Sequence, residues 1–301
     1  MLASLIICTR NREAQLKACL EYVARLEDLP GGWQLVLVDN GSTDTTPNVI
    51  RAFAGASTSY PVIAVHQPAR GLGRARNAGL ACATGDICIF TDDDCYVRPD
   101  FLRQVHRVFE TSPAGYLGGR VVLHDPTDAP VTIKDVLTRE IIQPRRFIHP
   151  GTIHGANMAV RRDVLKSIGG FDPLLGSGTR WVCDDVDFVA RACWAGWVGV
   201  YDPRPVVEHH HGRKAGSDVQ RVVKGYDYGI GAYYMKGILN PASRMVYLRE
   251  WNWGLRAHLR KGRIASPRRE LVGAITYLLS RLSSRERIPR FESAAQRARL
   301  S

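Results

Sequence analysis

Short apolar runs that are separated by helical patterns limit most strongly how this chain can fold. The runs Leu2–Cys8, Leu35–Val38, Val62–Val65 and Ile87–Phe90 have the length and composition of buried strands. Helical spacing of apolar residues lies between them, at Ala14–Leu26, after Thr43 and at Gly71–Ala83. Strands that alternate with helices predict a parallel sheet covered on both faces. We therefore expect an α/β fold with a mostly parallel central sheet.

Polar clusters stand directly after three of these runs, at Thr9–Arg12, Asp39–Ser42 and Thr91–Asp94. In open α/β sheets, ligands bind outside the carboxyl ends of the strands. One such cluster alone could be an ordinary polar loop. Three clusters that follow three strands predict one binding site at this edge of the sheet.

Three carboxylates stand side by side at Asp92, Asp93 and Asp94. Neighbouring carboxylates repel one another, so they stay ionised at low cost only when a cation neutralises them. In an extended segment Asp92 and Asp94 would face one ligand together. Their oxygens suit a hard divalent ion such as Mg²⁺ or Mn²⁺, which keeps open positions for a diphosphate. The alternative is a solvated acidic turn.

A second acidic cluster, Asp184 and Asp185, lies about ninety residues further on. Two acidic sites on one sheet suggest that one holds a cation while the other acts as a base. His209, His210 and His211 follow an apolar run, and imidazole can complete a metal shell. Alternation along a strand would place His209 and His211 on one side and His210 on the other. The alternative is a group of polar surface histidines.

Two further segments suit a nucleotide. Asp39 follows a strand, where its carboxylate could accept hydrogen bonds from a base or ribose, or could instead cap a turn. Gly71–Gly79 is not a dinucleotide fingerprint, because Arg76 replaces the last glycine of that motif. Arg74 and Arg76 at a helix start suit phosphate or base contacts, with a tight turn carrying solvated arginines as the alternative.

Five motifs in this order resemble the inverting GT-A nucleotide-sugar glycosyltransferases of family 2. They are Ile6–Arg12, Val36–Asp44, Gly71–Gly79, Phe90–Asp94 and Cys183–Phe188, and with His211 they span roughly two thirds of the chain. One motif alone is weak support, whereas five in order are specific. The resemblance implies a GT-A fold, an α/β domain with a mostly parallel central sheet flanked by helices, here followed by a helical basic C-terminal extension.

The resemblance also implies roles for single residues. The residues expected to bind the nucleotide are Thr9, Arg12, Asp39, Arg76 and Asp92. The residues expected to hold the metal are Asp94 and His211, or else His209. The implied cofactor is a divalent cation, Mn²⁺ or Mg²⁺.

Asp185 matches the second acid of the family's Glu-Asp motif, the usual catalytic base, and Asp184 stands at the first position as the alternative base. Asn157 and Trp181 are expected to contact the sugar or acceptor, although Trp181 could equally belong to the core. Such an enzyme moves a sugar from a UDP-, GDP- or dTDP-sugar to an acceptor hydroxyl, with inversion in one displacement. The implied products are polysaccharides, glycolipids or cell-envelope glycans.

The chain then divides into a nucleotide-sugar-binding half at residues 1–120, an acceptor and catalytic half of the same domain at 121–215, and a helical basic extension at 216–301. The formal net charge is +12, and the last fifty-one residues hold twelve Arg or Lys against three Glu. Leu271, Ile275, Leu278 and Leu282 fall at helical spacing. Such a helix either packs in a core or homodimer, or lies on an anionic membrane near a lipid-linked acceptor.

Two other functions fit part of the pattern. A sugar nucleotidyltransferase would also use paired Asp and a metal, but it carries a glycine-rich loop after its first strand, and Thr9–Arg12 has no glycine. A nucleic-acid-binding protein would use the basic extension but leave the acidic clusters unexplained, so nucleic acid is not the expected partner.

The expected location is the cytoplasm, with peripheral association at the inner face of the membrane. The seven cysteines form no CxxC pair, which favours a reducing compartment. The N-terminal segment lacks the basic residues of a signal peptide, and no apolar run reaches the length of a membrane span.

Overall fold

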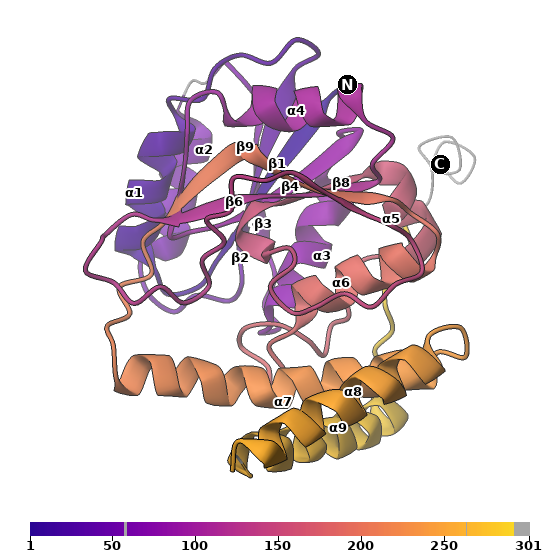
Figure 1. The fold of residues 1–301 in the computed structure, drawn as a ribbon. Helices are drawn as coiled ribbons and strands as arrows, with labels where there is room; N and C mark the ends of the chain where they lie inside the picture. Colours follow the sequence, from indigo (N-terminus) through magenta and orange to yellow (C-terminus); the bar gives the residue numbers. More distant parts are fainter. Residues whose placement is uncertain (57–58, 263, 292–301) are drawn as a thin grey trace.

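The computed structural model describes residues 1–56, 59–262 and 264–291 (Figure 1). Strands and helices alternate through its first part: β1 (Ala3–Thr9), α1 (Glu13–Val23), β2 (Trp33–Asp39), α2 (Thr46–Gly55), β3 (Val62–His66), α3 (Leu72–Cys82) and β4 (Ile87–Asp92). The four strands are parallel and lie in the order β3-β2-β1-β4. The expected α/β alternation is confirmed here, with strand and helix ends within a few residues of their predicted positions.

The second part of the sheet is mixed. Its elements are β5 (Cys95–Val97), α4 (Phe101–Thr111), β6 (Tyr116–Leu123), β7 (Glu140–Ile142), a 3₁₀ turn at Gly155–Asn157, β8 (Met158–Arg161), α5 (Arg162–Ile168), α6 (Asp184–Trp194) and β9 (Gly199–His209). β8 runs antiparallel to both β4 and β6, and β9 is parallel to β6 but antiparallel to β5 and β7. The expectation of a mostly parallel sheet is therefore corrected for this half. No crossover helix lies between β6 and β8, and such a helix is the usual link between parallel strands.

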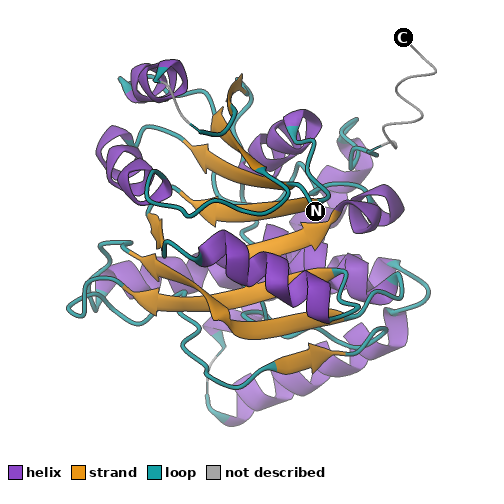
Figure 2. Ribbon diagram, turned by 90° about the horizontal axis from the view of Figure 1, so that it is seen from above, coloured by secondary structure: helices purple, strands orange, loops and turns teal. Residues whose placement is uncertain are grey.

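Helices cover both faces of the twisted sheet (Figure 2). Successive residues of β1 alternate between two cores, because strand side chains point to opposite faces. Leu5 and Ile7 pack in the core that includes α1 and α4, whereas Ile6 packs in the core that includes α3 and α6. Burial on both faces explains why the N-terminal strands are almost continuous apolar runs.

The C-terminal helices α7 (Ser217–Leu239), α8 (Arg244–Arg260) and α9 (Ala265–Ser283) form a layer beside the α/β domain (Figure 1). Glycines bring the backbones of α7 and α9 into close contact. A Cβ atom on Gly231 would collide with the carbonyl oxygen of Glu270, and one on Gly273 would collide with that of Tyr228. The two helices can therefore pack this closely only because both positions lack a side chain.

A buried polar cluster links these helices to the α/β domain. Lys236 of α7 lies 2.6 Å from a carboxylate oxygen of Asp172 and 2.8 Å from one of Asp187. The Tyr277 hydroxyl of α9 donates a 2.8 Å hydrogen bond to Asp172. The Trp181 indole N–H donates a 3.1 Å hydrogen bond to the carbonyl of Gly273 in α9. The C-terminal helices are thus attached to the α/β domain by these buried polar contacts as well as by the chain connection.

Two glycines of α7 offer a matched test of this packing. Gly231→Ala is expected to lower the free energy of unfolding by about 1–3 kcal/mol, because the added methyl meets backbone atoms that cannot rotate away. Gly225→Ala in the same helix meets nothing within 4 Å and is expected to be neutral or to stabilise by up to about 1 kcal/mol. Denaturant unfolding measures both; an equal effect of the two would contradict the proposed contact.

The Asp172 cluster predicts a pH-dependent stability. Burial raises the pKa of Asp172, but Lys236, the Leu174 amide and the Tyr277 hydroxyl outweigh this and lower the pKa to about 2. The folded value lies below the unfolded value of about 3.9, so the stabilisation is present above about pH 4 and is lost as the pH falls through 2. Wild type is therefore expected to exceed Asp172→Asn in unfolding free energy by about 2–3 kcal/mol at pH 5.

That difference should shrink as the pH falls towards 2, as measured by urea unfolding at a series of pH values. The control is Asp163→Asn, at an aspartate whose side chain is 68% exposed beside Lys166. Its difference from wild type should stay near zero at every pH. A difference for Asp172→Asn that does not change with pH would contradict the role of its charge.

Candidate active site

Three strand ends meet at one edge of the sheet. Thr9 at the end of β1 lies opposite Asp39 at the end of β2, and Cys8 lies opposite Asp92 of β4. A cavity of about 430 Å³ opens at this edge. Its charged and aromatic lining comes from both halves of the chain: Arg10, Arg12, Arg70, Arg76, Asp92, Asp93, Asp94, His154, Asp184, Asp185, His209, Arg213 and Tyr226. Each of the three strand-end clusters contributes to this lining, as expected, through Thr9, Arg10, Arg12, Asn40, Asp92, Asp93 and Asp94.

The first acidic cluster is neutralised from within the chain. Asp93 and Asp94 form a tight turn after β4, so the expectation of an extended segment with alternating side chains is wrong here. The Arg12 guanidinium lies 2.7 Å from Asp93 and 2.8 Å from Asp94, and the Thr9 hydroxyl donates a 2.6 Å hydrogen bond to Asp93. The Asp92 side chain, 32% exposed, faces the cavity. The turn thus gives the three carboxylates different surroundings.

These surroundings separate the pKa values of the two buried acids. Burial raises the pKa of Asp93 to about 7, although the charge of Arg12 opposes the rise. Burial also raises the pKa of Asp94, but His209 and Arg12 outweigh it and hold that pKa below its ordinary value. Burial thus dominates at Asp93, whereas the charges of His209 and Arg12 dominate at Asp94.

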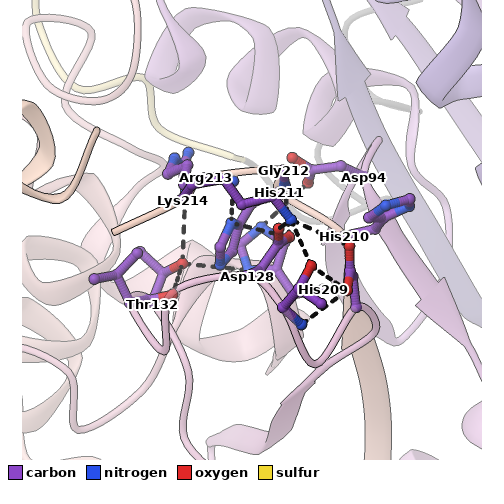
Figure 3. A network of polar contacts seen from close by, with 12 residues as sticks. Asp94, Asp128, Thr132, His209, His210, His211, Gly212, Arg213 and Lys214 are labelled. Atoms are coloured by element: carbon purple, nitrogen blue, oxygen red, sulfur yellow. Dashed lines mark hydrogen bonds and ion pairs between the residues drawn. The ribbon is translucent and has the colours of Figure 1, made fainter. Parts of the chain in front are cut away.

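The histidines alternate as expected, and they separate into two environments. The Nε2 atom of His209 lies 3.4 Å from a carboxylate oxygen of Asp94, whereas His210 contacts the Tyr96 hydroxyl on the other side. His211 faces Asp128, with 3.5 Å between its Nδ1 and the carboxylate (Figure 3). The structure thus brings His209 to Asp94, and His211 does not line the cavity.

The chemistry of the donor atoms around Asp94 fits a divalent cation. The ligand atoms of Asp94, Cys95 and His209 all lie within 4.8 Å of one another. Carboxylate oxygen and imidazole nitrogen are common ligands of Mn²⁺ and related ions. Arg12 already contacts the same carboxylate, so a cation held here would share Asp94 with a guanidinium.

Polar contacts with Asp128 and Thr132 fix the segment that ends β9 and follows it, residues 209–214 (Figure 3). The buried Asp128 carboxylate accepts hydrogen bonds from the Gly212 amide at 2.8 Å and from the Lys214 ammonium at 2.6 Å. The Thr132 hydroxyl lies 3.3 Å from Nδ1 of His209. These contacts hold the segment that carries His209 and Arg213 beside the cavity; Asp128 acts from outside the lining, whereas Thr132 belongs to it.

Arg76 joins the two acidic clusters. Its guanidinium is buried and lies 2.6 Å from Asp184 and 3.3 Å from Asp92. It also donates a 3.1 Å hydrogen bond to the carbonyl of Gly155, and a Cβ atom on Gly155 would fall 2.6 Å from the guanidinium. Burial raises the pKa of Asp184 to about 6 against the opposing charge of Arg76.

Asp185 is the acid of the second cluster that has no arginine partner among the described residues. It stands in the first turn of α6 and is only partly buried. One oxygen accepts a 3.0 Å hydrogen bond from the Gly155 amide. The Asp184 carboxylate is therefore held in its ion pair with Arg76. The Asp185 carboxylate has no such pair among the described residues and lines the cavity.

Besides His211, three further predicted residues lie outside the cavity lining, namely Asp39, Asn157 and Trp181. Asp39 accepts a 2.9 Å hydrogen bond from the Ser42 amide and lies 2.9 Å from His66. The Asn157 amide donates to two backbone carbonyls at 2.9 and 3.0 Å. Trp181 is buried and its N–H is bonded to α9. The structure does not bring Asn157 or Trp181 to the site, because the polar groups of both are used inside the fold.

Sequence reasoning missed several residues of the cavity lining. Arg70, Arg213 and Tyr226 line it but were not expected there. Arg70 directly precedes the Gly71 turn, and Arg213 follows the three histidines by two positions, so both stood beside recognised motifs. Tyr226 lies in α7, forty-one residues after Asp185, and no local pattern marked it.

Comparisons with known proteins match this arrangement. The family model described as Glycosyl transferase family 2 matches residues 4–169, and that described as Glycosyl transferase family group 2 matches residues 87–254. The glycosyltransferase AglE of Haloferax volcanii is 26% identical over 218 residues, 68% of this chain and 68% of AglE. The putative glycosyltransferase EpsH of Bacillus subtilis is 31% identical over 104 residues, 35% of this chain and 29% of EpsH.

Two solved structures share the fold. The mannosyltransferase PcManGT of Pyrobaculum calidifontis, in complex with GDP-Man and Mn²⁺, has a TM-score of 0.63 at 19% identity and covers 99% of this chain and 78% of its own. Residues 1–349 of S. aureus TarS, in complex with UDP-GlcNAc, have a TM-score of 0.62 at 16% identity and cover 82% and 69%. Both confirm the GT-A fold expected from the five motifs.

The buried pair of Arg76 and Asp184 generates a stability prediction. Arg76→Met leaves the buried carboxylate of Asp184 without its partner and is expected to lower the free energy of unfolding by about 3–5 kcal/mol. Arg74→Met, in the same helix, removes a surface pair with Glu286 and is expected to cost less than about 1 kcal/mol. Denaturant unfolding of both variants is the measurement; a small loss for Arg76→Met would mean that water already solvates Asp184.

Proposed function

We propose that this chain, which belongs to glycosyl transferase family 2 and is a glycosyltransferase, moves a sugar from a nucleoside diphosphate sugar to an acceptor hydroxyl with inversion. The observation that carries the proposal is the position of Asp185. It lines the same cavity as Asp92, Asp94 and His209, but its carboxylate has no cationic partner among the described residues. One wall of the cavity thus suits a diphosphate and the other offers a base.

Asp185 is proposed as the catalytic base. The acceptor hydroxyl gives its proton to the Asp185 carboxylate while its oxygen bonds to the anomeric carbon of the donor. The bond between that carbon and the phosphate oxygen breaks, and the nucleoside diphosphate leaves with the bonding electrons. Attack from the face opposite the leaving group inverts the anomeric centre in one displacement. The amide of Gly155 keeps the carboxylate in place.

The arginines of the cavity are proposed to bind the diphosphate. None of Arg10, Arg70 and Arg213 is ion-paired within the described part of the chain, and all three line the cavity. Arginine suits phosphate because its planar guanidinium offers paired donors. A divalent cation, Mn²⁺ or Mg²⁺, held by Asp94 and His209 would supply further neutralisation of the leaving diphosphate.

The remaining assignments follow from the same arrangement. Thr9, Arg12, Asp92 and Arg76 are proposed to bind the nucleotide; all four line the cavity, and Arg76 lies 3.3 Å from Asp92. Asp39 is proposed to bind the base or ribose, because each of its oxygens has one contact, to Ser42 or to His66, and keeps a further lone pair. PcManGT and TarS are described with GDP-Man and UDP-GlcNAc, which supports a nucleotide-sugar donor here. The proposed product is a polysaccharide, glycolipid or cell-envelope glycan, and the proposed place of its synthesis is the cytoplasmic face of a membrane.

Release of nucleoside diphosphate across a panel of UDP-, GDP- and dTDP-sugars, with and without Mn²⁺, tests the proposal. Asp185→Asn is expected to lose about 10²–10⁴-fold in turnover, because it removes the base, while its affinity for the nucleotide stays close to that of wild type. Asp94→Asn is expected to lose the dependence on Mn²⁺ together with turnover. Asp163→Asn, at an exposed surface aspartate, should match wild type.

The outcomes separate the parts of the proposal. Full turnover by Asp185→Asn with loss in Asp184→Asn would move the base to Asp184. Turnover of one donor after treatment with a chelator and without any added cation would contradict the proposed dependence on a divalent cation. It would still support the proposed sugar transfer. Failure of wild type to bind any nucleotide sugar would overturn the proposed donor class.

A further inference from the structure

Exposed apolar side chains gather on the C-terminal helices. Of the fourteen large hydrophobic residues exposed in the described chain, eleven belong to residues 217–283. Four of them, Leu271, Ile275, Leu279 and Leu282, are spaced by four, four and three residues on α9 and so lie on one side of that helix. The opposite side of α9 is buried against α7 through Gly273 and Ala274. The outward side therefore has no partner within the described chain.

α8 adds a second exposed stripe. Arg249, Trp253, Arg256 and Arg260 follow one another at spacings of four, three and four residues. The Trp253 side chain is prominent, with 67% of its residue surface exposed. The Trp251 indole N–H bonds to Glu270 at 2.9 Å and so ties α8 to α9. Both helices lie on the side of α7 away from the sheet (Figure 1), and their outward residues are here named the α8–α9 face.

The charges of the α8–α9 face have one sign. Its exposed charged residues, with those of the adjoining turns, are Arg244, Arg249, Arg256, Arg260, Lys261, Arg268 and Arg285. Of the two acids in α8 and α9, Glu270 is buried and Glu250 is half-buried beside Arg249. A second copy of the chain meeting this face with its own would bring arginine against arginine, which is unfavourable. An anionic surface is complementary to it.

The exposed apolar side chains of α9 indicate which kind of anionic surface would bind to the α8–α9 face. Leucine and isoleucine side chains at helical spacing, with tryptophan and arginine beside them, are the composition of helices that lie in the plane of a bilayer interface. No helix among the described residues combines the length and apolar character needed to cross a bilayer. The exposed leucines, tryptophan and arginines have a composition that suits a membrane surface.

We infer that the α8–α9 face binds an anionic lipid bilayer, with its leucines, Ile275 and Trp253 in the interface and its arginines on the lipid phosphates. α7 connects this face to the cavity, because Tyr226 lines the cavity while Gly231 of the same helix contacts α9. Bilayer binding itself needs no nucleotide. Only its consequence, that a lipid-linked acceptor would be held near Asp185, rests on the proposed function.

Co-sedimentation with vesicles tests this inference. Wild type is expected to bind vesicles of equal parts phosphatidylcholine and phosphatidylglycerol, to bind phosphatidylcholine alone weakly, and to be released by high salt. Arg256→Glu with Arg260→Glu is expected to weaken binding by at least about tenfold. Leu271→Ser with Ile275→Ser should also weaken it by about tenfold or more, because both side chains leave the interface.

Matched controls lie outside the C-terminal helices. Arg107→Glu on α4 and Leu137→Ser, at exposed positions of the α/β domain, should leave vesicle binding unchanged. Circular dichroism and nucleotide binding of each variant separate a lost surface from a lost fold. Equal binding of wild type to neutral and anionic vesicles, or to neither, would overturn the inference. A homodimer in solution that Leu271→Ser with Ile275→Ser dissociates would assign the face to a second copy instead.

Discussion

The rest of the site depends on one buried guanidinium. Arg76 stands between Asp92 of the first acidic cluster and Asp184 of the second, at 3.3 and 2.6 Å, and rests against the rings of Phe90 and Phe171. Without this charge, carboxylates from two distant parts of the chain could not be buried around one cavity, since isolated buried ions are costly. Gly155 completes the arrangement, because any side chain at that position would occupy the space of the guanidinium. Its amide also fixes Asp185, so one turn positions the counter-charge and the proposed base.

The C-terminal extension is built into this arrangement. Trp181, three residues before Asp184, donates its indole N–H to α9, and Asp187 in the first turn of α6 binds Lys236 of α7. The helix that begins with the two acids is therefore held on both sides by the extension. A displacement of α7 or α9 would move Asp185 relative to Asp94. These contacts connect the proposed membrane-binding face to the proposed catalytic base.

The sequence predicts the N-terminal part well because local signals are strong there. β1, β2 and β4 are apolar runs closed by polar clusters, and their parallel register follows from the helices between them. β8 was not foreseen, since Met158–Arg161 is too short to show a period. Asp94 and His209 are 115 residues apart, and only the pairing of β5 with β9 brings them together. Tyr226 and Asp128 belong to the site through tertiary packing alone, and no local pattern encodes such packing.

The charges around the cavity point to what it can accept. Five aspartates and five arginines line it, but they are not paired one to one. Two of the arginines, Arg12 and Arg76, form ion pairs with four of the aspartates: Asp92, Asp93, Asp94 and Asp184. The other three arginines line the cavity and have no carboxylate partner in the described chain: Arg10, Arg70 and Arg213. A polyanionic ligand would supply the missing negative charge on that side. Asp185 has no ion pair with those arginines among the described residues, and it faces the cavity as the proposed base. Under the proposed function, the diphosphate of the donor would pair with these arginines, which the hydroxyls of an uncharged sugar could not do.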